Sequence, residues 1–206
     1  MRILISAGPT REYLDPVRFI SNASSGKIGV ALAARAKSLG HHVTLVLGPC
    51  EASPPGVDEL VNVTSAADMY NAVLTRFDGC DAFIAAAAVS DYRPLHREDR
   101  KIKKSDARFV VEMERTRDIL GEMSRRSRRQ TLVGFCLETE DIENRARGKL
   151  EAKNLDLVIA NGPEAIGADR VDALLLRRSG PTERLTQVTK ADLAAHVLRA
   201  IGADKA

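Results

Sequence analysis

The chain has 206 residues, 44% of them hydrophobic, which suits a single domain over residues 1–206 with a substantial core. The 31 basic and 28 acidic residues nearly cancel, so the total charge gives no case for a nucleic-acid partner. The three cysteines lack CxxC spacing and no apolar run reaches membrane-spanning length, so we expect no disulfide framework, no zinc site and no membrane anchor, but an unprocessed cytoplasmic protein.

Short apolar segments alternate with helical ones along most of the chain, and the apolar segments are typical of buried parallel strands. In chain order, the sequence predicts strand 3–6, helix 26–39, strand 43–47, helix 66–77, strand 82–85, helix 116–127, strand 131–135, helix 140–153 and strand 157–160. Ser65 and Thr116 are the expected start signals of two of these helices. The alternation predicts a doubly wound, Rossmann-like α/β sheet that is mostly parallel.

The pattern changes near the end of the chain. Two short strand-like runs, 173–176 and 183–188, are joined by Ser179-Gly180-Pro181 and predict an antiparallel hairpin at the sheet edge. A last helix over about 190–201 would pack back on the sheet.

Four loops follow the carboxyl ends of predicted strands, where ligands bind in open α/β sheets. They span residues 7–25, 86–108, 136–140 and 161–167. The second is long, polar and basic, and loops of that length in compact domains are usually functional or disordered. We therefore expect the ligand site among these loops.

Two common nucleotide motifs are absent. The first strand is not followed by GxGxxG, the second ends at Leu47-Gly48-Pro49 without an acid for a ribose, and SSGK lacks the spacing of a Walker A loop. What remains is a helix start formed by Ser24, Ser25, Gly26 and Lys27, which predicts a phosphate site. The alternative is a serine N-cap beside a solvated lysine.

A second segment with possible chemistry runs from Ala85 to Pro94, where small residues would let a ligand approach the backbone. It leads into Lys101-Ile102-Lys103-Lys104. A lysine cluster on a loop is often only solvated, but over a phosphate site it would act as a closing lid.

Five motifs occur in a fixed order: GPTREYLDPVRFISNASSGKIG, AAAVSDYRP, KIKK, VGFCLETED and KNLDLVIAN. Together they closely resemble the phosphopantothenoylcysteine synthetases, the second half of the bacterial bifunctional coenzyme A biosynthesis flavoproteins. The resemblance covers nearly the whole chain and implies a cytoplasmic ligase that uses CTP, 4′-phosphopantothenate and L-cysteine, with Mg²⁺. The chain would correspond to the synthetase unit alone, and whether the flavin-dependent decarboxylase is a separate partner or a removed domain stays open.

The resemblance assigns roles to individual residues. Asn22 would bind the acyl carbonyl of an acyl-cytidylate, and Lys101 would reach over the α-phosphate, which makes these two the catalytic residues. Arg18 would cross the interface of a homodimer to grip the phosphate of phosphopantothenate, and Ala87 joins Asn22 and Arg18 as a substrate-binding residue. The alternatives are a turn role for Asn22 and an ion pair of Arg18 with Asp15 or Glu12.

The nucleotide is implied to lie among further residues. These are Ser24, Ser25, Gly26 and Lys27 at the triphosphate, and Asp91, Phe135, Lys149 and Lys153 around cytosine and ribose. Phe135 could equally be a core residue at the end of a central strand, and the magnesium ligands are unassigned.

The chain departs from the family pattern at Pro9, which lacks a backbone donor, and at Cys136-Leu137-Glu138-Thr139. These departures bear on nucleotide preference more than on chemistry. Two other functions stay open on the sequence alone: an NAD(P)-dependent oxidoreductase on the same fold, and a noncatalytic nucleotide-binding protein.

Overall fold

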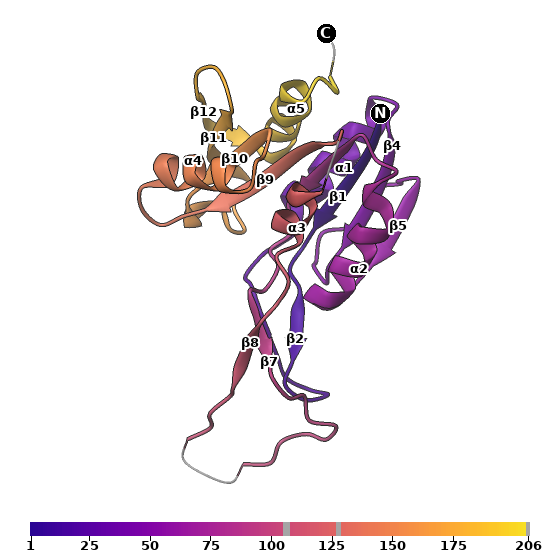
Figure 1. Cartoon of the computed structure of the whole chain (residues 1–206), viewed down its shortest axis with the longest axis vertical. Helices are drawn as coiled ribbons and strands as arrows, with labels where there is room; N and C mark the ends of the chain where they lie inside the picture. The colour runs from indigo at the N-terminus through magenta and orange to yellow at the C-terminus, as the bar shows by residue number, and fades with distance from the viewer. Residues whose placement is uncertain (105–107, 127–128, 205–206) are drawn as a thin grey trace.

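A mostly parallel eight-stranded sheet forms the centre of this computed structural model, which describes residues 1–104, 108–126 and 129–204 (Figure 1). Its strands are β1 (Arg2–Ala7), β4 (His42–Leu47), β5 (Glu59–Asn62), β6 (Ala82–Ala85), β9 (Thr131–Leu137), β10 (Leu157–Asn161), β11 (Arg170–Arg177) and β12 (Glu183–Thr189). The order across the sheet is β12-β11-β10-β9-β6-β1-β4-β5. Only the pairs that involve β11 and β12 are antiparallel, which confirms the predicted fold class and its C-terminal hairpin.

Helices cover both faces of the sheet. They are α1 (Lys27–Ser38), α2 (Ala66–Phe77), α3 (Ile119–Arg125), α4 (Ile142–Ala152), α5 (Lys190–Ala200) and the short 3₁₀ helix η1 (Pro163–Ala165). Successive side chains of a strand point to opposite faces, so Ile5 of β1 packs in one core with Leu32 of α1, while Leu4 packs with α2 in the other. α1 and α5 pack in the first core, and α2, α3 and α4 pack in the second. Helices on both faces of the sheet can therefore contact a ligand at the carboxyl ends of its strands. No described helix is long and apolar enough to cross a membrane.

Most predicted elements lie within two residues of their observed bounds. β11 begins three residues earlier than predicted, at Arg170, and two further details differ. The edge strand β5 was missed. The predicted helix 116–127 is shorter, because Thr116 donates its hydroxyl to the Ser90 carbonyl at 2.6 Å and leaves Asp118 as the N-cap; residue 127 lies outside the described residues. Ser65 does cap α2, in a reciprocal capping box with Asp68.

Two of the loops expected to be irregular contain paired strands. The loop after β1 folds into β2 (Arg11–Tyr13) and β3 (Phe19–Ser21), and the loop after β6 forms β7 (Tyr92–Pro94), which pairs with β8 (Met113–Arg115). Both pairs extend away from the sheet in Figure 1. We call the described residues of 11–21 and 92–115 the arm.

Candidate functional site

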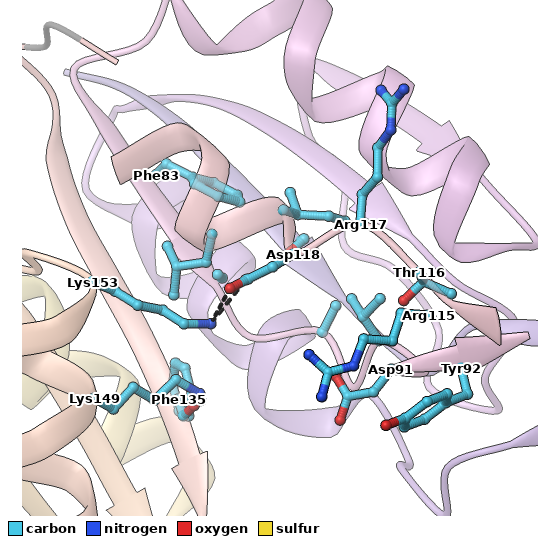
Figure 2. A pocket seen from close by; sticks show the side chains of 16 residues that line it. Phe83, Asp91, Tyr92, Arg115, Thr116, Arg117, Asp118, Phe135, Lys149 and Lys153 are labelled. Carbon is cyan, nitrogen blue, oxygen red and sulfur yellow. Dashed lines mark hydrogen bonds and ion pairs between the residues drawn. The ribbon is translucent and has the colours of Figure 1, made fainter. Parts of the chain in front are cut away.

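Two adjoining cavities lie at the carboxyl ends of the parallel strands. The first, about 470 Å³, is lined by 22–29 before and within α1, and we call it the α1 cavity. The second, about 420 Å³, is lined by 115–120 around the start of α3, and we call it the α3 cavity (Figure 2). Both are lined by Ala87, Val89, Asp91, Phe135 and Lys149. One extended ligand could therefore occupy both, as expected where βα loops gather.

The N-terminus of α1 opens into the α1 cavity without a side-chain cap. Gly26 is the N-cap, with φ of 73°, so neither Ser24 nor Ser25 caps the helix as the alternative reading required. A Cβ on Gly26 would lie 2.6 Å from the Cys50 sulfur, so glycine is needed for both conformation and space. The free N–H groups and the positive end of the helix dipole suit an anion.

Lys27, the first residue of α1, lines the α1 cavity and forms an ion pair with Asp169. Its Nζ lies 3.0 Å from Asp169 Oδ1, and both side chains are largely exposed. The hydrogen bond from Lys27 is the main reason that the pKa of Asp169 is lowered. Since an exposed pair of this kind contributes little stability, an anionic ligand could displace Asp169 from Lys27.

Asn22 connects the segment before α1 to the loop after β6. Its amide nitrogen donates to the carbonyl of Ala88 at 3.0 Å and to that of Val89 at 3.2 Å. Pro9 forms a bridge with Ala88 beside them. Asn22 thus holds the backbone directly after Ala87, which lines both cavities.

In the α3 cavity, Figure 2 shows Lys153, the residue that ends α4, pointing toward Asp118 before α3, with Lys149 beside Phe135. Lys153 Nζ lies 2.7 Å from an Asp118 carboxylate oxygen, while partly buried Lys149 donates to the Phe135 carbonyl. Burial lowers the pKa of Lys149. For Asp118, burial acts in the opposite sense, but the hydrogen bonds from Lys153 and the Gly121 amide prevail and lower its pKa. Phe135 is partly buried and lines both cavities, so it is both a core residue and a site residue.

Three cavity-lining cations were missed by sequence reasoning. In Figure 2, Arg115 points toward Asp91, and Arg117 turns away toward α2, where its guanidinium lies 4.6 Å from the Tyr70 ring centre. Lys190, at the start of α5, lines the α1 cavity. No motif pointed to these residues. Arg115 and Arg117 flank Thr116, which the sequence predicted as a helix start, and Lys190 belongs to none of the motifs.

Arg18 and Lys101 lie on the arm, and neither is among the described residues that line the α1 or α3 cavity. Arg18 forms an ion pair with Asp15 at 2.6 Å, as its alternative reading expected, and donates to the Ile102 carbonyl at 2.6 Å. Lys101 lines a separate arm groove of about 620 Å³. The structure thus brings these two residues near each other but not to the remaining predicted site residues of the same chain.

A catalytic thiolate and a metal site built from clustered protein side chains find little support. Cys136 is buried and donates to Glu138, and burial is the first cause of the raised pKa of its thiol, which disfavours a thiolate nucleophile. Among the described residues, no group of three or more His, Cys, Asp and Glu side chains could hold a metal ion.

Comparison with known proteins identifies the chain. The family model described as "DNA/pantothenate metabolism flavoprotein C-terminal domain" matches residues 1–204. The chain is 45% identical over 206 residues to the "Coenzyme A biosynthesis bifunctional protein CoaBC" of Bacillus subtilis (strain 168), covering 98% of this chain and 51% of that protein. It therefore spans about half the length of the curated relatives it matches.

Solved structures agree with this match. The crystal structure of the C-terminal domain of a coenzyme A biosynthesis bifunctional protein CoaBC has a TM-score of 0.84 and 39% identity, covering 97% of this chain and 93% of that one. A DNA/pantothenate metabolism flavoprotein from Streptococcus pneumoniae has a TM-score of 0.85 and 26% identity, covering 98% and 99%. The chain belongs to the family of DNA/pantothenate metabolism flavoprotein C-terminal domains.

Proposed function

We propose that the chain is a phosphopantothenate–cysteine ligase, which joins 4′-phosphopantothenate and L-cysteine with CTP as the activating nucleotide. The observation that carries this proposal is the pair of continuous cavities, which bring an uncapped helix N-terminus, Lys27 and Lys149 around one space. The relative from Bacillus subtilis is named for coenzyme A biosynthesis, which agrees with this chemistry.

The reaction needs positive charge because two anions must meet. A carboxylate does not form an amide with an amine near neutral pH, so it must first be activated. Its oxygen attacks the α-phosphorus of CTP, the bond to the β-phosphate breaks, and pyrophosphate leaves. The approach of each charge pair at 4 Å costs about 1 kcal/mol in water and about 4 kcal/mol at an intermediate dielectric. Fixed donors and cations offset this repulsion.

In our proposal the triphosphate lies at the N-terminus of α1, bound by Ser24, Ser25, Gly26 and Lys27. The nucleoside lies toward the α3 cavity, among Asp91, Phe135, Lys149 and Lys153. The support is that all eight line one or both cavities. A cation held against the Phe135 carbonyl, as Lys149 is, is well positioned to read the edge of a base.

The second step is attack of the cysteine amine on the acyl carbon; the bond to the cytidylate oxygen breaks, CMP leaves, and the amine loses a proton. We propose that Asn22 donates to the acyl oxygen as it gains charge, next to Ala87. Its amide nitrogen now donates to Ala88 and Val89, so one of these bonds must exchange when the acyl group binds.

Magnesium would enter with the nucleotide. Mg²⁺ commonly binds through one or two carboxylates together with substrate phosphates, and Asp91 is a carboxylate that lines both cavities. These residues fit an ion carried by CTP, held by its phosphates and Asp91. The bound ion would neutralise charge on the phosphates.

We propose a homodimer to bring in the arm. Exposed apolar side chains gather on it, with Val17 58%, Phe109 60% and Val110 84% exposed. Surfaces of this kind mark protein interfaces. The arm of a second copy would then deliver Arg18 to the phosphate of phosphopantothenate and Lys101 to the α-phosphate.

The test is to incubate the protein with Mg²⁺, phosphopantothenate, L-cysteine and each nucleoside triphosphate in turn. We expect pyrophosphate and CMP in equal amounts, with CTP preferred and both substrates required. Binding of CTP without pyrophosphate release would favour a noncatalytic protein, and tight NADPH binding without a CTP effect on melting would favour an oxidoreductase. The product would go to a flavin-dependent decarboxylase in the cytoplasm.

A further inference from the structure

Lys190 is a lysine that is largely buried, with only 8% of the residue exposed. In the part of the chain that the structure describes, its ammonium forms no hydrogen bond or ion pair. Lysine is almost never fully buried unless it is paired. Replacing a buried charge with an apolar residue is often neutral or stabilising. A lysine at this position therefore points to a role for its charge.

The location of Lys190 makes its charge more unfavourable still. It is the first residue of α5, where the positive end of the helix dipole repels a cation. The acid in the first turn of the same helix, Asp192, accepts from the Thr189 hydroxyl at 2.7 Å, and the acid that acts on Lys190 is Asp169 instead. The local sequence of α5 therefore gives no reason for a lysine here.

The surroundings of Lys190 are those of an anion site. It lines the α1 cavity together with Lys27 and the uncapped start of α1. Lys27 and Asp169 are the charges that act on it, one repelling and one attracting. Among the described residues, the α1 cavity is thus lined by the lysines Lys27, Lys149 and Lys190 and by one carboxylate, Asp91. Even with Asp169 paired to Lys27, this leaves net positive charge for an anionic ligand.

Lysines on opposite faces of the sheet set the orientation of this ligand in the cavities. Lys149 approaches the shared part of the cavities from α4, whereas Lys27 and Lys190 approach from α1 and α5 on the opposite face. A nucleotide with its nucleoside near Lys149 and Phe135 would therefore extend its phosphate chain toward Lys190. The phosphates farthest from the nucleoside reach that end.

We infer that Lys190 binds the terminal phosphates of the nucleoside triphosphate and the pyrophosphate that leaves, and so distinguishes a triphosphate from a monophosphate. This rests on the proposed function for the identity of the nucleotide. It goes further by assigning a residue outside the recognised motifs to the leaving group. When the phosphates bind Lys190 and Lys27, Asp169 is released from Lys27.

The test compares Lys190→Met with Lys37→Met, which removes an α1 lysine that pairs with Asp58 away from both cavities. Affinities for CTP, CMP and inorganic tripolyphosphate are measured by calorimetry on the full chain. We expect Lys190→Met to weaken CTP and tripolyphosphate about tenfold or more while CMP changes less than about twofold, as for the loss of a charge-assisted hydrogen bond. Lys37→Met should bind all three ligands as the unsubstituted protein does.

The melting temperature distinguishes a loss of ligand binding from a loss of folding. Removal of a largely buried charge should leave the melting temperature of Lys190→Met unchanged or raised. Equal tripolyphosphate affinity in the unsubstituted protein and Lys190→Met, or no tripolyphosphate binding at all, would overturn the inference. Lys190-dependent tripolyphosphate binding in a protein that forms no amide would leave the inference standing and refute the proposed function.

Discussion

Arg18 donates a hydrogen bond from Nη2 to the backbone carbonyl of Ile102 at 2.6 Å and so joins the two parts of the arm. Buried Asp15 completes the junction, because it accepts from the Ile102 amide at 3.1 Å and from the Arg18 amide at 2.9 Å. Burial opposes the charge of Asp15, but these bonds and that from Val17 prevail and hold its pKa well below its usual range. Since Lys101 directly precedes Ile102, residues 15–18 fix where Lys101 stands.

Substitution Asp15→Asn should loosen this junction, because an amide accepts fewer bonds and carries no charge for Arg18. We expect faster hydrogen exchange at the Ile102 amide and at least a tenfold lower turnover. The affinity for CTP should change less than about twofold, since neither Asp15 nor Ile102 lines the α1 or α3 cavity. Asp99→Asn, in the same loop, is the matched control. Unchanged exchange at Ile102 would contradict the account of the arm.

Gly26→Ala should be more harmful than Gly40→Ala. Both glycines have left-handed backbones, with φ of 73° and 77°, so both substitutions incur strain of about 1–2 kcal/mol. Only at Gly26 does the new methyl clash, 2.6 Å from the Cys50 sulfur, and overpacking of this kind costs about 1–3 kcal/mol more. Urea denaturation measures the difference, and adding Cys50→Ala should recover most of it. Equal losses at the two glycines would exclude a steric role for Cys50.

Lowering the pH should remove the contribution of Asp58 to the stability of the fold over a defined pH range. The hydrogen bond from Lys37, and next that from the Val43 amide, lower the pKa of Asp58 from 3.8 to about 2. A lowered folded-state pKa means that the stabilisation is complete above about pH 4 and is lost as the pH falls toward 2. The difference in melting temperature between the unsubstituted protein and Asp58→Asn should therefore be constant above pH 4 and vanish near pH 2. A difference that persists at pH 2 would contradict this.

Cys136→Ala should retain most turnover, because the reacting thiol-bearing molecule is the substrate cysteine and the buried Cys136 thiol has a raised pKa. The variant is assayed by pyrophosphate release at saturating substrates. Complete loss of turnover in a folded variant would point to thiol catalysis instead.

The parallel sheet could be predicted from the sequence because its central strands are buried on both faces and leave continuous apolar runs. β5 escaped this signal because it is an edge strand with alternating burial. β7 and β8 were missed for another reason: each has three residues, and Tyr92 pairs with Arg115 across a long intervening loop. Short strands paired at such a distance leave no local pattern.

Site residues in loops after the parallel strands could be predicted from the sequence. Site residues that only the packing of distant segments brings to the cavities could not. Gly26 and Asp91 follow strands in a parallel sheet, so their loops meet at one edge. Lys190 follows the antiparallel hairpin, and only the packing of α5 beside α1 brings it to the same cavity. No local feature of the sequence around Lys190 encodes that contact.

In the proposed reaction, the carboxylate of phosphopantothenate is activated when its oxygen joins the α-phosphate of CTP. Phosphopantothenate labelled with ¹⁸O in its carboxylate tests this step most directly, with CTP and L-cysteine present and mass spectrometry of the products. We expect one ¹⁸O atom in each CMP released, because the oxygen that attacked phosphorus leaves with it. Label in inorganic phosphate, or unlabelled CMP beside newly formed amide, would contradict it.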